Sequence, residues 1–225
     1  MCNRINQYVT PSQLQEFFDV LRAPEYQPRY LVNPTDPLLF LVDGDQGREG
    51  RIGSWGFSTR WSPTEVVFNS RAGEIFKTPM WKKVILEQRC LVPVASYYEY
   101  QDIGRRRKPR WHIRLRSNEP MGLAGVFNDR GEVSVLTTEP NAEQGKIHDR
   151  MPVILPPGDW RGYLDPTKHV ADAILPFLRT APDGSLVLQA VKPSNKDWPV
   201  DSPHWIEPCG PPVIERQRTL FDSEA

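Results

Sequence analysis

Four apolar runs follow one another in the middle of the chain: CLVPVASYYEYQ (residues 90–101), WHIRLR (111–116), MGLAGVFN (121–128) and EVSVLTT (132–138). Each has the length of a strand and is rich in β-branched or aromatic residues. Turn-forming segments separate the runs, among them Asp129, Arg130 and Gly131 between the last two. The pattern predicts an antiparallel meander of strands.

Shorter segments on both sides continue the alternation of strands and turns. We predict further strands over residues 2–9, 37–43, 51–57, 65–69, 151–155 and 185–191. A first helix begins at Thr10, with Pro11 at its first position and Gln13 completing a capping box, and it stops before Pro24. Further helices are predicted over residues 78–88, 157–164 and 170–178. The expected fold class is α+β, with a curved, partly barrel-like antiparallel β-sheet core flanked by short helices.

The composition is that of a globular protein with many loops. Of the 225 residues, 39% are hydrophobic and 25% are charged, while 23 are prolines. A chain of this size buries enough surface to fold without a disulfide or a metal. We find no internal repeat and no interior linker. We therefore expect one domain over residues 1–192, with a proline-rich tail over residues 193–225 that packs on this domain or trails from it.

The charge balance bears on nucleic-acid binding. The formal net charge is zero, which does not favour a protein that coats nucleic acid without specificity. A DNA site must then be a local cluster of basic side chains. The basic run over residues 105–110 lies between two predicted strands, and it is either a solvated hairpin loop or a phosphate-binding site.

Three scattered cysteines, Cys2, Cys90 and Cys209, indicate neither a disulfide framework nor a zinc site, and we expect no metal and no cofactor. Such cysteine usage is typical of a reducing compartment. No segment approaches the ~20 apolar residues of a membrane span, and the N-terminus lacks the apolar core of a signal peptide. We expect a cytoplasmic protein, without contact to a membrane and without an obligate protein partner.

Cys2 is the first residue with chemical potential. Removal of Met1 would leave an α-amine and a thiol on adjacent carbons, and both groups are partly deprotonated near neutral pH. Such a 1,2-aminothiol reacts with an aldehyde, first through a Schiff base and then by closing a thiazolidine ring. On its own, Cys2 is more readily explained as an incidental second residue.

Three further polar positions stand out. Asn69 ends an apolar strand and precedes Arg71; its amide can orient an amine, although a strand-ending turn is the favoured explanation when this position is taken alone. Glu99 lies among tyrosines, which suits a general acid, unless it faces solvent. His148 occupies a polar loop where Asp149 can orient it for proton transfer, and the alternative is a surface histidine.

Taken together and in this order, these positions resemble the SRAP domain family, the SOS response-associated peptidases. The segments that carry the resemblance are Met1 and Cys2 with Arg4, residues 69–72 (NSRA), 93–99 (PVASYYE), 147–155 (IHDRMPVIL), 55–61 and 76–81. The resemblance covers residues 1–192 and makes this segment an SRAP-like catalytic domain. The run IHDRMPVIL and the N-terminal cysteine are its most specific parts.

The resemblance implies an abasic-site sensor on single-stranded DNA that acts in the DNA damage response and is associated with the nucleoid when bound to DNA. By this resemblance, Cys2 captures the aldehyde of the opened sugar as a thiazolidine and forms a DNA–protein crosslink. Asn69 would position the α-amine of Cys2, and Glu99 would assist proton transfer. His148 would help open the sugar and reverse the crosslink.

The resemblance also implies a DNA-binding set and removal of Met1 by the protein itself. The residues expected to hold backbone phosphates or, for the tryptophan, to stack on a base are Arg4, Arg71, Arg150 and Trp61. The chain departs from the family pattern at Asn3, Leu31 and Ser62. These departures affect the expected path of the DNA more than the covalent chemistry.

Two other function classes remain open at this point. An N-terminal-nucleophile amidohydrolase, such as a glutamine amidotransferase domain, would also use Cys2 but requires a four-layer αββα fold. A binding module without catalysis would not need Asn69, Glu99 and His148 together. The high proline content and short strands argue against the first class, and the retained polar residues argue against the second.

Overall fold

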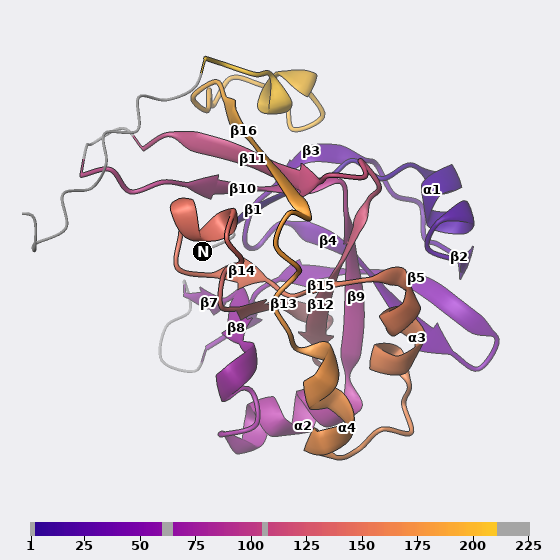
Figure 1. Ribbon diagram of the computed structural model, residues 1–225. Coiled ribbons are helices and arrows are strands. Elements are labelled where there is room, and N and C mark those ends of the chain that lie inside the picture. Colours follow the sequence, from indigo (N-terminus) through magenta and orange to yellow (C-terminus); the bar gives the residue numbers. More distant parts are fainter. Residues whose placement is uncertain (1–2, 60–64, 105–107, 211–225) are drawn as a thin grey trace, which may run out of the picture.

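The computed structural model describes residues 3–59, 65–104 and 108–210, and its centre consists of two β-sheets that pack on each other (Figure 1). The strands are β1 (Arg4–Gln7), β2 (Val20–Arg22), β3 (Arg29–Val32), β4 (Pro37–Gly44), β5 (Gly47–Trp55), β6 (Phe57–Ser58), β7 (Val66–Val67), β8 (Asn69–Arg71), β9 (Arg89–Val94), β10 (Ser96–Tyr100), β11 (Arg110–Leu115), β12 (Met121–Phe127), β13 (Glu132–Thr138), β14 (Met151–Pro152), β15 (Ile154–Leu155) and β16 (Leu186–Val191).

Short helices complete the architecture. The α-helices are α1 (Pro11–Glu16), α2 (Pro79–Glu87), α3 (Pro157–Leu164) and α4 (Ala171–Ile174), and the 3₁₀ helices are η1 (Ala72–Glu74), η2 (Gln144–Lys146), η3 (Leu175–Phe177) and η4 (Pro203–Ile206). The capping box predicted at Thr10 is confirmed: its hydroxyl accepts from the Gln13 backbone N–H, and the Gln13 side chain accepts from the Thr10 N–H.

One sheet has five strands in the order β16-β11-β10-β1-β3, and all of its pairs are antiparallel. Strand β10 lies at its centre, between β1 and β11. The register places Tyr98 opposite both Arg4 and His112, and Glu99 opposite Trp111. Because alternate residues of a strand face opposite sides, Tyr97 and Glu99 point to one face of this sheet and Tyr98 to the other.

The second sheet closes into a ring. Its main path is β14-β13-β12-β9-β4-β5-β2, and β13 also pairs in parallel with β5 and with β8. The closure brings backbones close together: the Ser54 N–H donates to the Gly131 carbonyl at 3.0 Å, and a Cβ on Gly53 would lie 2.1 Å from that same oxygen. A side chain at position 53 would therefore force β5 and β13 apart. The predicted α+β fold with a curved sheet and short flanking helices is confirmed, and the partly barrel-like core is a ring with both antiparallel and parallel pairs instead of a true barrel.

Three apolar clusters define the layers. The first lies between the two sheets, with Tyr97 and Ile113 from one and Val133 and Trp55 from the other. The second lies on the opposite face of the ring, under α1, α2, α3 and α4. In Figure 1, α2 and α4 accordingly lie at the end of the molecule away from the five-stranded sheet. A third, smaller cluster joins Tyr98 to Trp205 of η4 on the outer face of the five-stranded sheet.

The predicted antiparallel meander over residues 90–138 is confirmed for two hairpins, β10–β11 and β12–β13, and is wrong in the connections before and between them. The run 90–101 breaks at Ala95, whose N–H donates to the Asn6 carbonyl at 2.8 Å, so β9 joins the ring and β10 joins the other sheet. Strand β11 pairs with β10 and β16 instead of β12. The prediction assumed that neighbours in sequence pair. The chain instead crosses twice between sheets, because each sheet needs inward-facing apolar residues from this region.

Several element boundaries also differ from the prediction. The first helix ends at Glu16, and the chain turns through Asp19, with φ 55°, into β2. The strand predicted over residues 65–69 is divided into β7 and β8, and the helix over 170–178 is divided into α4 and η3. The turn at Asp129–Gly131 is confirmed, with the Gly131 N–H donating to the Asn128 carbonyl.

Residues 193–210 lie along the five-stranded sheet. The Leu31 N–H donates to the Val200 carbonyl, and the Cys209 N–H donates to the Ala190 carbonyl, each at 3.0 Å. Trp205 is buried against Tyr98, with its indole N–H donating to the Pro199 carbonyl. Within the described ranges, no helix has the length and apolar content needed to cross a bilayer.

Glu132 fixes the point where the ring closes. Its carboxylate accepts hydrogen bonds from Asn128 Nδ2 and Arg130 Nη2, each at 2.7 Å, and from the Ser58 hydroxyl. Burial raises the pKa of Glu132, but the hydrogen bonds from Arg130, Ser58 and Asn128 outweigh it and lower the pKa to about 2. Folding therefore favours the ionised carboxylate.

We expect Glu132→Gln to lower the free energy of unfolding by about 1–3 kcal/mol at pH 7, because the amide cannot accept all of these bonds. Since the folded pKa lies below the unfolded value, the contribution of Glu132 is complete above about pH 4.5. It is lost as the pH falls toward about 2. Urea unfolding at pH 7 and pH 3 measures the difference in free energy of unfolding between wild type and variant, and this difference should be smaller at pH 3. An equal difference at both pH values would contradict this account. Glu139→Gln, at an exposed position, serves as control.

Candidate functional site

The loop that carries His148 is built around Gln144, which is fully buried in η2. The Gln144 N–H donates to Asn141 Oδ1 at 3.0 Å, and its side-chain Nε2 donates to the Arg150 carbonyl at 3.1 Å. The His148 N–H donates to the Gln144 carbonyl at 3.0 Å. One glutamine thus organises the backbone on both sides of His148.

The same loop is tied to strand β10. Tyr97 donates its hydroxyl proton to Gln144 Oε1 at 3.0 Å, and Gln101 Nε2 donates to the Lys146 carbonyl at 2.9 Å. Glu99 lies between Tyr97 and Gln101 on the same face of the strand and is only 2% exposed. Glu99 therefore points to the side of the sheet on which Tyr97 and Gln101 bind the loop of His148.

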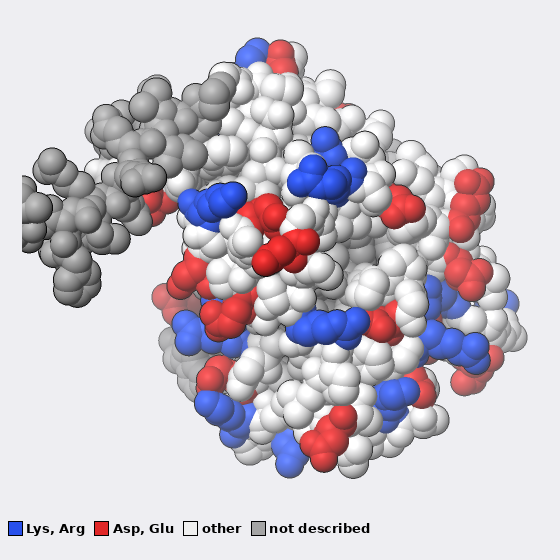
Figure 2. Space-filling view, in the orientation of Figure 1, with Lys and Arg blue, Asp and Glu red and all other residues white. Residues whose placement is uncertain are grey.

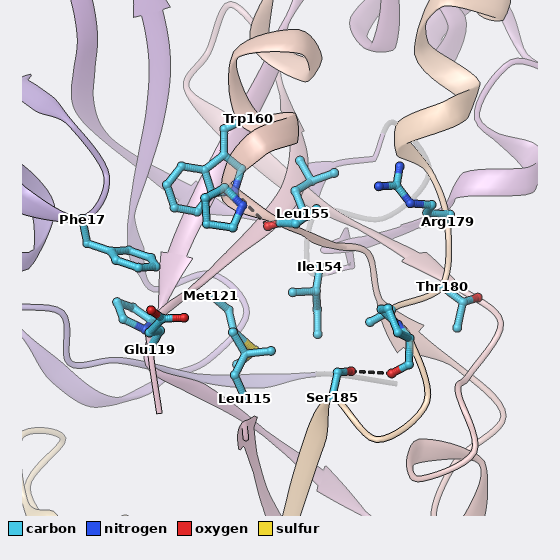
Figure 3. A pocket seen from close by; sticks show the side chains of 15 residues that line it. Phe17, Leu115, Glu119, Met121, Ile154, Leu155, Trp160, Arg179, Thr180 and Ser185 are labelled. Atoms are coloured by element: carbon cyan, nitrogen blue, oxygen red, sulfur yellow. Dashed lines mark hydrogen bonds between the residues drawn. The ribbon is translucent and has the colours of Figure 1, made fainter. Parts of the chain in front are cut away.

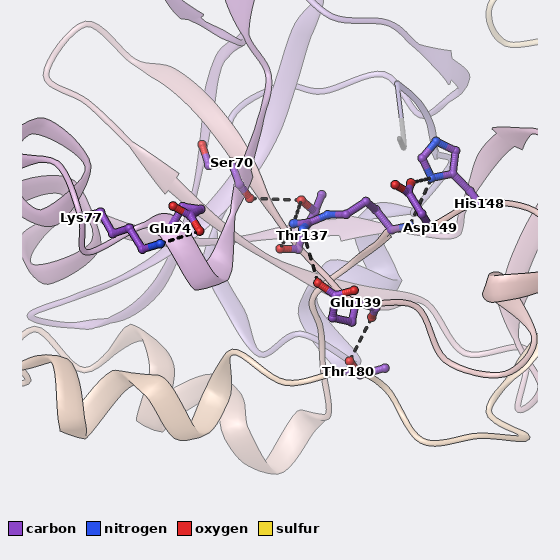
Figure 4. Close-up of polar contacts among 9 residues, drawn as sticks. Ser70, Glu74, Lys77, Thr137, Glu139, His148, Asp149 and Thr180 are labelled. Atoms are coloured by element: carbon purple, nitrogen blue, oxygen red, sulfur yellow. Dashed lines mark hydrogen bonds and ion pairs between the residues drawn. The ribbon is translucent and has the colours of Figure 1, made fainter.

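His148 has two competing partners at one ring nitrogen. Its Nδ1 lies 3.1 Å from the Arg150 backbone nitrogen and 2.7 Å from Asp149 Oδ1 (Figure 4). An unprotonated Nδ1 accepts the Arg150 N–H, whereas a protonated Nδ1 donates to the Asp149 carboxylate. Which of the two partners Nδ1 binds therefore depends on which ring nitrogen carries a proton. The side chain of Asp149 is 84% exposed, so it can approach or leave Nδ1 without a packing cost.

Arg150 anchors the other end of the loop to the ring. Its Nη2 donates to both the carbonyl and the hydroxyl oxygen of Thr137 at 2.7 Å, and Nη1 lies 3.8 Å from Glu139 (Figure 4). The Arg150 side chain is 13% exposed. Its guanidinium therefore holds the loop on β13, besides any role toward a phosphate.

Asn69 and Arg71 belong to β8, on the other side of β13 from β14. The register places Asn69 beside Val135 and Arg71 beside Thr137, so both point to the face on which Arg150 reaches Thr137. Ser70 points to the opposite face, where its hydroxyl lies 2.7 Å from that of Ser134. Asn69 is half-buried and Arg71 is exposed.

Arg4 lies at the start of β1, opposite Tyr98 of β10. Its Nε donates to Asn33 Oδ1 at 3.2 Å, and its guanidinium carbon lies 5.0 Å from the ring centre of Tyr100. Tyr98 and Tyr100 point away from the face of Glu99. The structure therefore places the side chain of Arg4 on the outer face of the five-stranded sheet, although its backbone adjoins the strand that carries Glu99.

The predictions for Cys2, Trp61 and Ser62 fall outside the described residues, as do residues 105–107 of the basic run 105–110. Over the face seen in Figure 2, basic and acidic side chains are interspersed. Among residues 3–59, 65–104 and 108–210, no group of three or more histidine, cysteine or acidic side chains is arranged to hold a metal.

Several residues of the site escaped the sequence reasoning. They are Tyr97, Gln101, Thr137, Asn141 and Gln144. For the first two a signal was available, since they share the face of Glu99 at spacings of two residues. Thr137 and Gln144 acquire their roles through contacts with Arg150 and Tyr97, which are distant in sequence and which no local pattern indicates. Asn141 accepts from the Gln144 N–H three residues further along the chain.

Two cavities accompany these elements. One, of about 360 Å³, adjoins the candidate site and is lined in part by Gln101, Trp111, Lys146 and Ile147. The other, of about 240 Å³, is mainly apolar and is lined by Phe17, Trp160 and neighbouring side chains (Figure 3). Neither cavity is lined by a predicted site residue.

Comparisons with known proteins identify a family for the chain. Residues 1–196 match the family model SOS response associated peptidase (SRAP). Similar sequences include the abasic site processing protein YoaM of Bacillus subtilis, 29% identical over 79% of this chain and 85% of the relative, and YedK of Escherichia coli, 25% identical over 70% and 76%.

Solved structures also resemble the fold. A protein from Bacteroides thetaiotaomicron superimposes with a TM-score of 0.80 at 19% identity, covering 92% of this chain and 100% of that one. A phage-related protein from Bordetella bronchiseptica gives 0.71 at 25% identity, covering 85% and 95%. With its family match, its relatives and its fold in agreement, the chain belongs to the SRAP family of SOS response associated peptidases.

Proposed function

We propose that this protein is an abasic site processing protein that binds single-stranded DNA carrying abasic sites and crosslinks to them through Cys2. The observation that carries the proposal is the convergence of Glu99 with the loop of His148, through the hydrogen bonds of Tyr97 and Gln101. Strand β10, which carries Glu99, pairs directly with β1, and β1 follows Cys2 in the sequence. Family membership and the names of the relatives support it.

The proposed chemistry begins with the opened sugar of the abasic site. The α-amine of Cys2 adds to the aldehyde carbon and gives a carbinolamine, which loses one water to form a Schiff base. The Cys2 thiol then adds to the imine carbon, its proton goes to the nitrogen, and a five-membered thiazolidine results. The net reaction joins protein and DNA and releases one water, without an oxidant or a cofactor.

Each proton transfer in this sequence needs a nearby donor or acceptor. Glu99, buried beside the loop, is placed to protonate the departing hydroxyl of the carbinolamine. His148 would open the sugar, because an imidazole can both accept and donate a proton and its Nδ1 lies within hydrogen-bond distance of the Asp149 carboxylate. Asn69, on the face of β8 toward Arg150, would orient the α-amine.

Removal of Met1 is a condition of this chemistry. While the Met1–Cys2 peptide bond is intact, the nitrogen of Cys2 is an amide and cannot form a Schiff base. Hydrolysis adds one water across that bond and releases methionine. We assign this step to the protein itself, in keeping with the peptidase in the family description.

The DNA would be held by Arg4, Arg71 and Arg150, with Trp61 stacking on a base beside the lesion. Arg71 is exposed on the same face as Asn69, which supports its role toward a phosphate. A glutamine amidotransferase-like function is less well supported, because that fold has helices on both outer faces. Here α1 to α4 all pack on one apolar cluster, on one face of the ring, and Trp205 of η4 covers the outer face of the other sheet.

Incubation with a single-stranded oligonucleotide that carries one abasic site should give a denaturation-resistant shifted band with wild type and none with Cys2→Ala. An oligonucleotide with a tetrahydrofuran site, which lacks the aldehyde, is the matched control and should give no band. Intact-mass analysis should show the loss of Met1 and an adduct equal to protein plus DNA minus one water. An equal band with Cys2→Ala would overturn the proposal.

We expect Arg71→Ala to weaken DNA binding and to reduce the slope of log K against log salt concentration by about 0.7, the value for one phosphate contact on a single strand. Fluorescence anisotropy on the tetrahydrofuran oligonucleotide between low and moderate salt measures this slope. An unchanged slope for Arg71→Ala would remove this residue from the DNA-binding set.

Arg150→Ala should in addition lower the free energy of unfolding by about 1–3 kcal/mol, because the two oxygen atoms of Thr137 lose the hydrogen bonds that Arg150 donates.

A further inference from the structure

We propose that Gln144, together with Tyr97, is a positioning residue that sets the separation between Glu99 and His148. This inference rests on the proposed function, because it assigns how two of its residues are held. Neither residue carries a reactive group for the crosslinking chemistry. Their contribution is the geometry in which the carboxyl and the imidazole meet the substrate.

Hydrogen bonds flank Glu99 and His148 in the same way. Tyr97 of β10 and Gln101, which directly follows β10, stand two positions before and after Glu99. Gln101 reaches the Lys146 carbonyl directly, and Tyr97 reaches the Arg150 carbonyl through the Gln144 amide. Lys146 and Arg150 stand two positions before and after His148. Two bridges that flank Glu99 thus end on carbonyls that flank His148.

The chemistry of the bridge requires an amide at position 144. Its Oε1 accepts the Tyr97 hydroxyl proton while its Nε2 donates to the Arg150 carbonyl, and the side chain is fully buried. A carboxylate would keep the first bond but would face the Arg150 carbonyl without a proton to donate. An apolar side chain would leave both partners buried and unsatisfied.

The bridge also joins the two sheets. Tyr97 belongs to the five-stranded sheet, whereas Arg150 is fastened to Thr137 of the ring. Without the Gln144 amide, the loop 146–150 remains attached to the ring through Arg150, but of its described hydrogen bonds to the segment 97–101 it keeps that of Gln101 and loses the bridge to Tyr97. The loop of His148 would then shift relative to Glu99, and a displacement of about 1 Å at reacting groups costs up to about 10²-fold in rate.

The test compares Gln144→Leu, Gln144→Glu and Tyr97→Phe with wild type. The matched control is Tyr163→Phe, which removes a hydroxyl that is equally buried and donates to the Gly125 carbonyl at 2.8 Å, under the opposite face of the ring. Two quantities are measured: the single-turnover crosslinking rate at saturating abasic DNA as a function of pH, and the affinity for the tetrahydrofuran oligonucleotide.

We expect Gln144→Leu and Tyr97→Phe to lower the maximal crosslinking rate by about 10- to 10²-fold and to alter its pH profile, with unchanged affinity for the tetrahydrofuran oligonucleotide. Tyr163→Phe should keep the wild-type rate and profile, although it also loses a buried hydrogen bond. The double variant Gln144→Leu with Tyr97→Phe should be no slower than Gln144→Leu alone, because both changes break one bridge.

The outcomes separate this inference from the proposed function. If wild type forms no crosslink that depends on Cys2, the proposed function fails. If wild type crosslinks but the variants keep its maximal rate and pH profile, the positioning role is overturned. An equal loss in Tyr163→Phe would also overturn it, since stability alone would then explain the effect. Should Gln144→Leu fail to fold, Tyr97→Phe, which removes a single oxygen atom, decides the question.

Discussion

The parallel pairing of β13 with β5 and β8 is the constraint on which the rest of the structure depends. It closes the ring, and it requires the close approach of Gly53 to the Gly131 carbonyl. Because β8 is held on one side of β13 and β14 on the other, the segment with Asn69 and the loop with His148 are brought to one end of the same strand. A ring opened at this point would separate them.

The candidate site then arises where this end of the ring meets β10 of the other sheet. The contact is polar although it borders an apolar core: buried Tyr97, Glu99, Gln101 and Gln144 lie between the sheets. Buried polar groups of this kind fix a single arrangement when they are satisfied, because each alternative leaves a donor or an acceptor without a partner. The geometry of the site is thus a by-product of how the two sheets are joined.

Local patterns predicted most strands, the capping box at Thr10 and the helix near 79–87, because these depend on residues close in sequence. The break at Ala95 was missed, since an unbroken apolar run of this length reads as one strand. Only the pairing of Ala95 with Asn6, far away in the chain, divides it. The same reason explains why Gln144 and Thr137 were missed while Asn69, Glu99 and His148 were singled out.

The sequence by itself determined the residue types at the site and, through their order, the family of the protein. Tertiary structure alone decided which of them meet: Glu99 faces the loop of His148, whereas the side chain of Arg4 lies on the outer face of its sheet. The reason is physical. The side a strand residue faces follows from local alternation, but what lies on that side depends on sheet order and register, which are set by contacts across the whole chain.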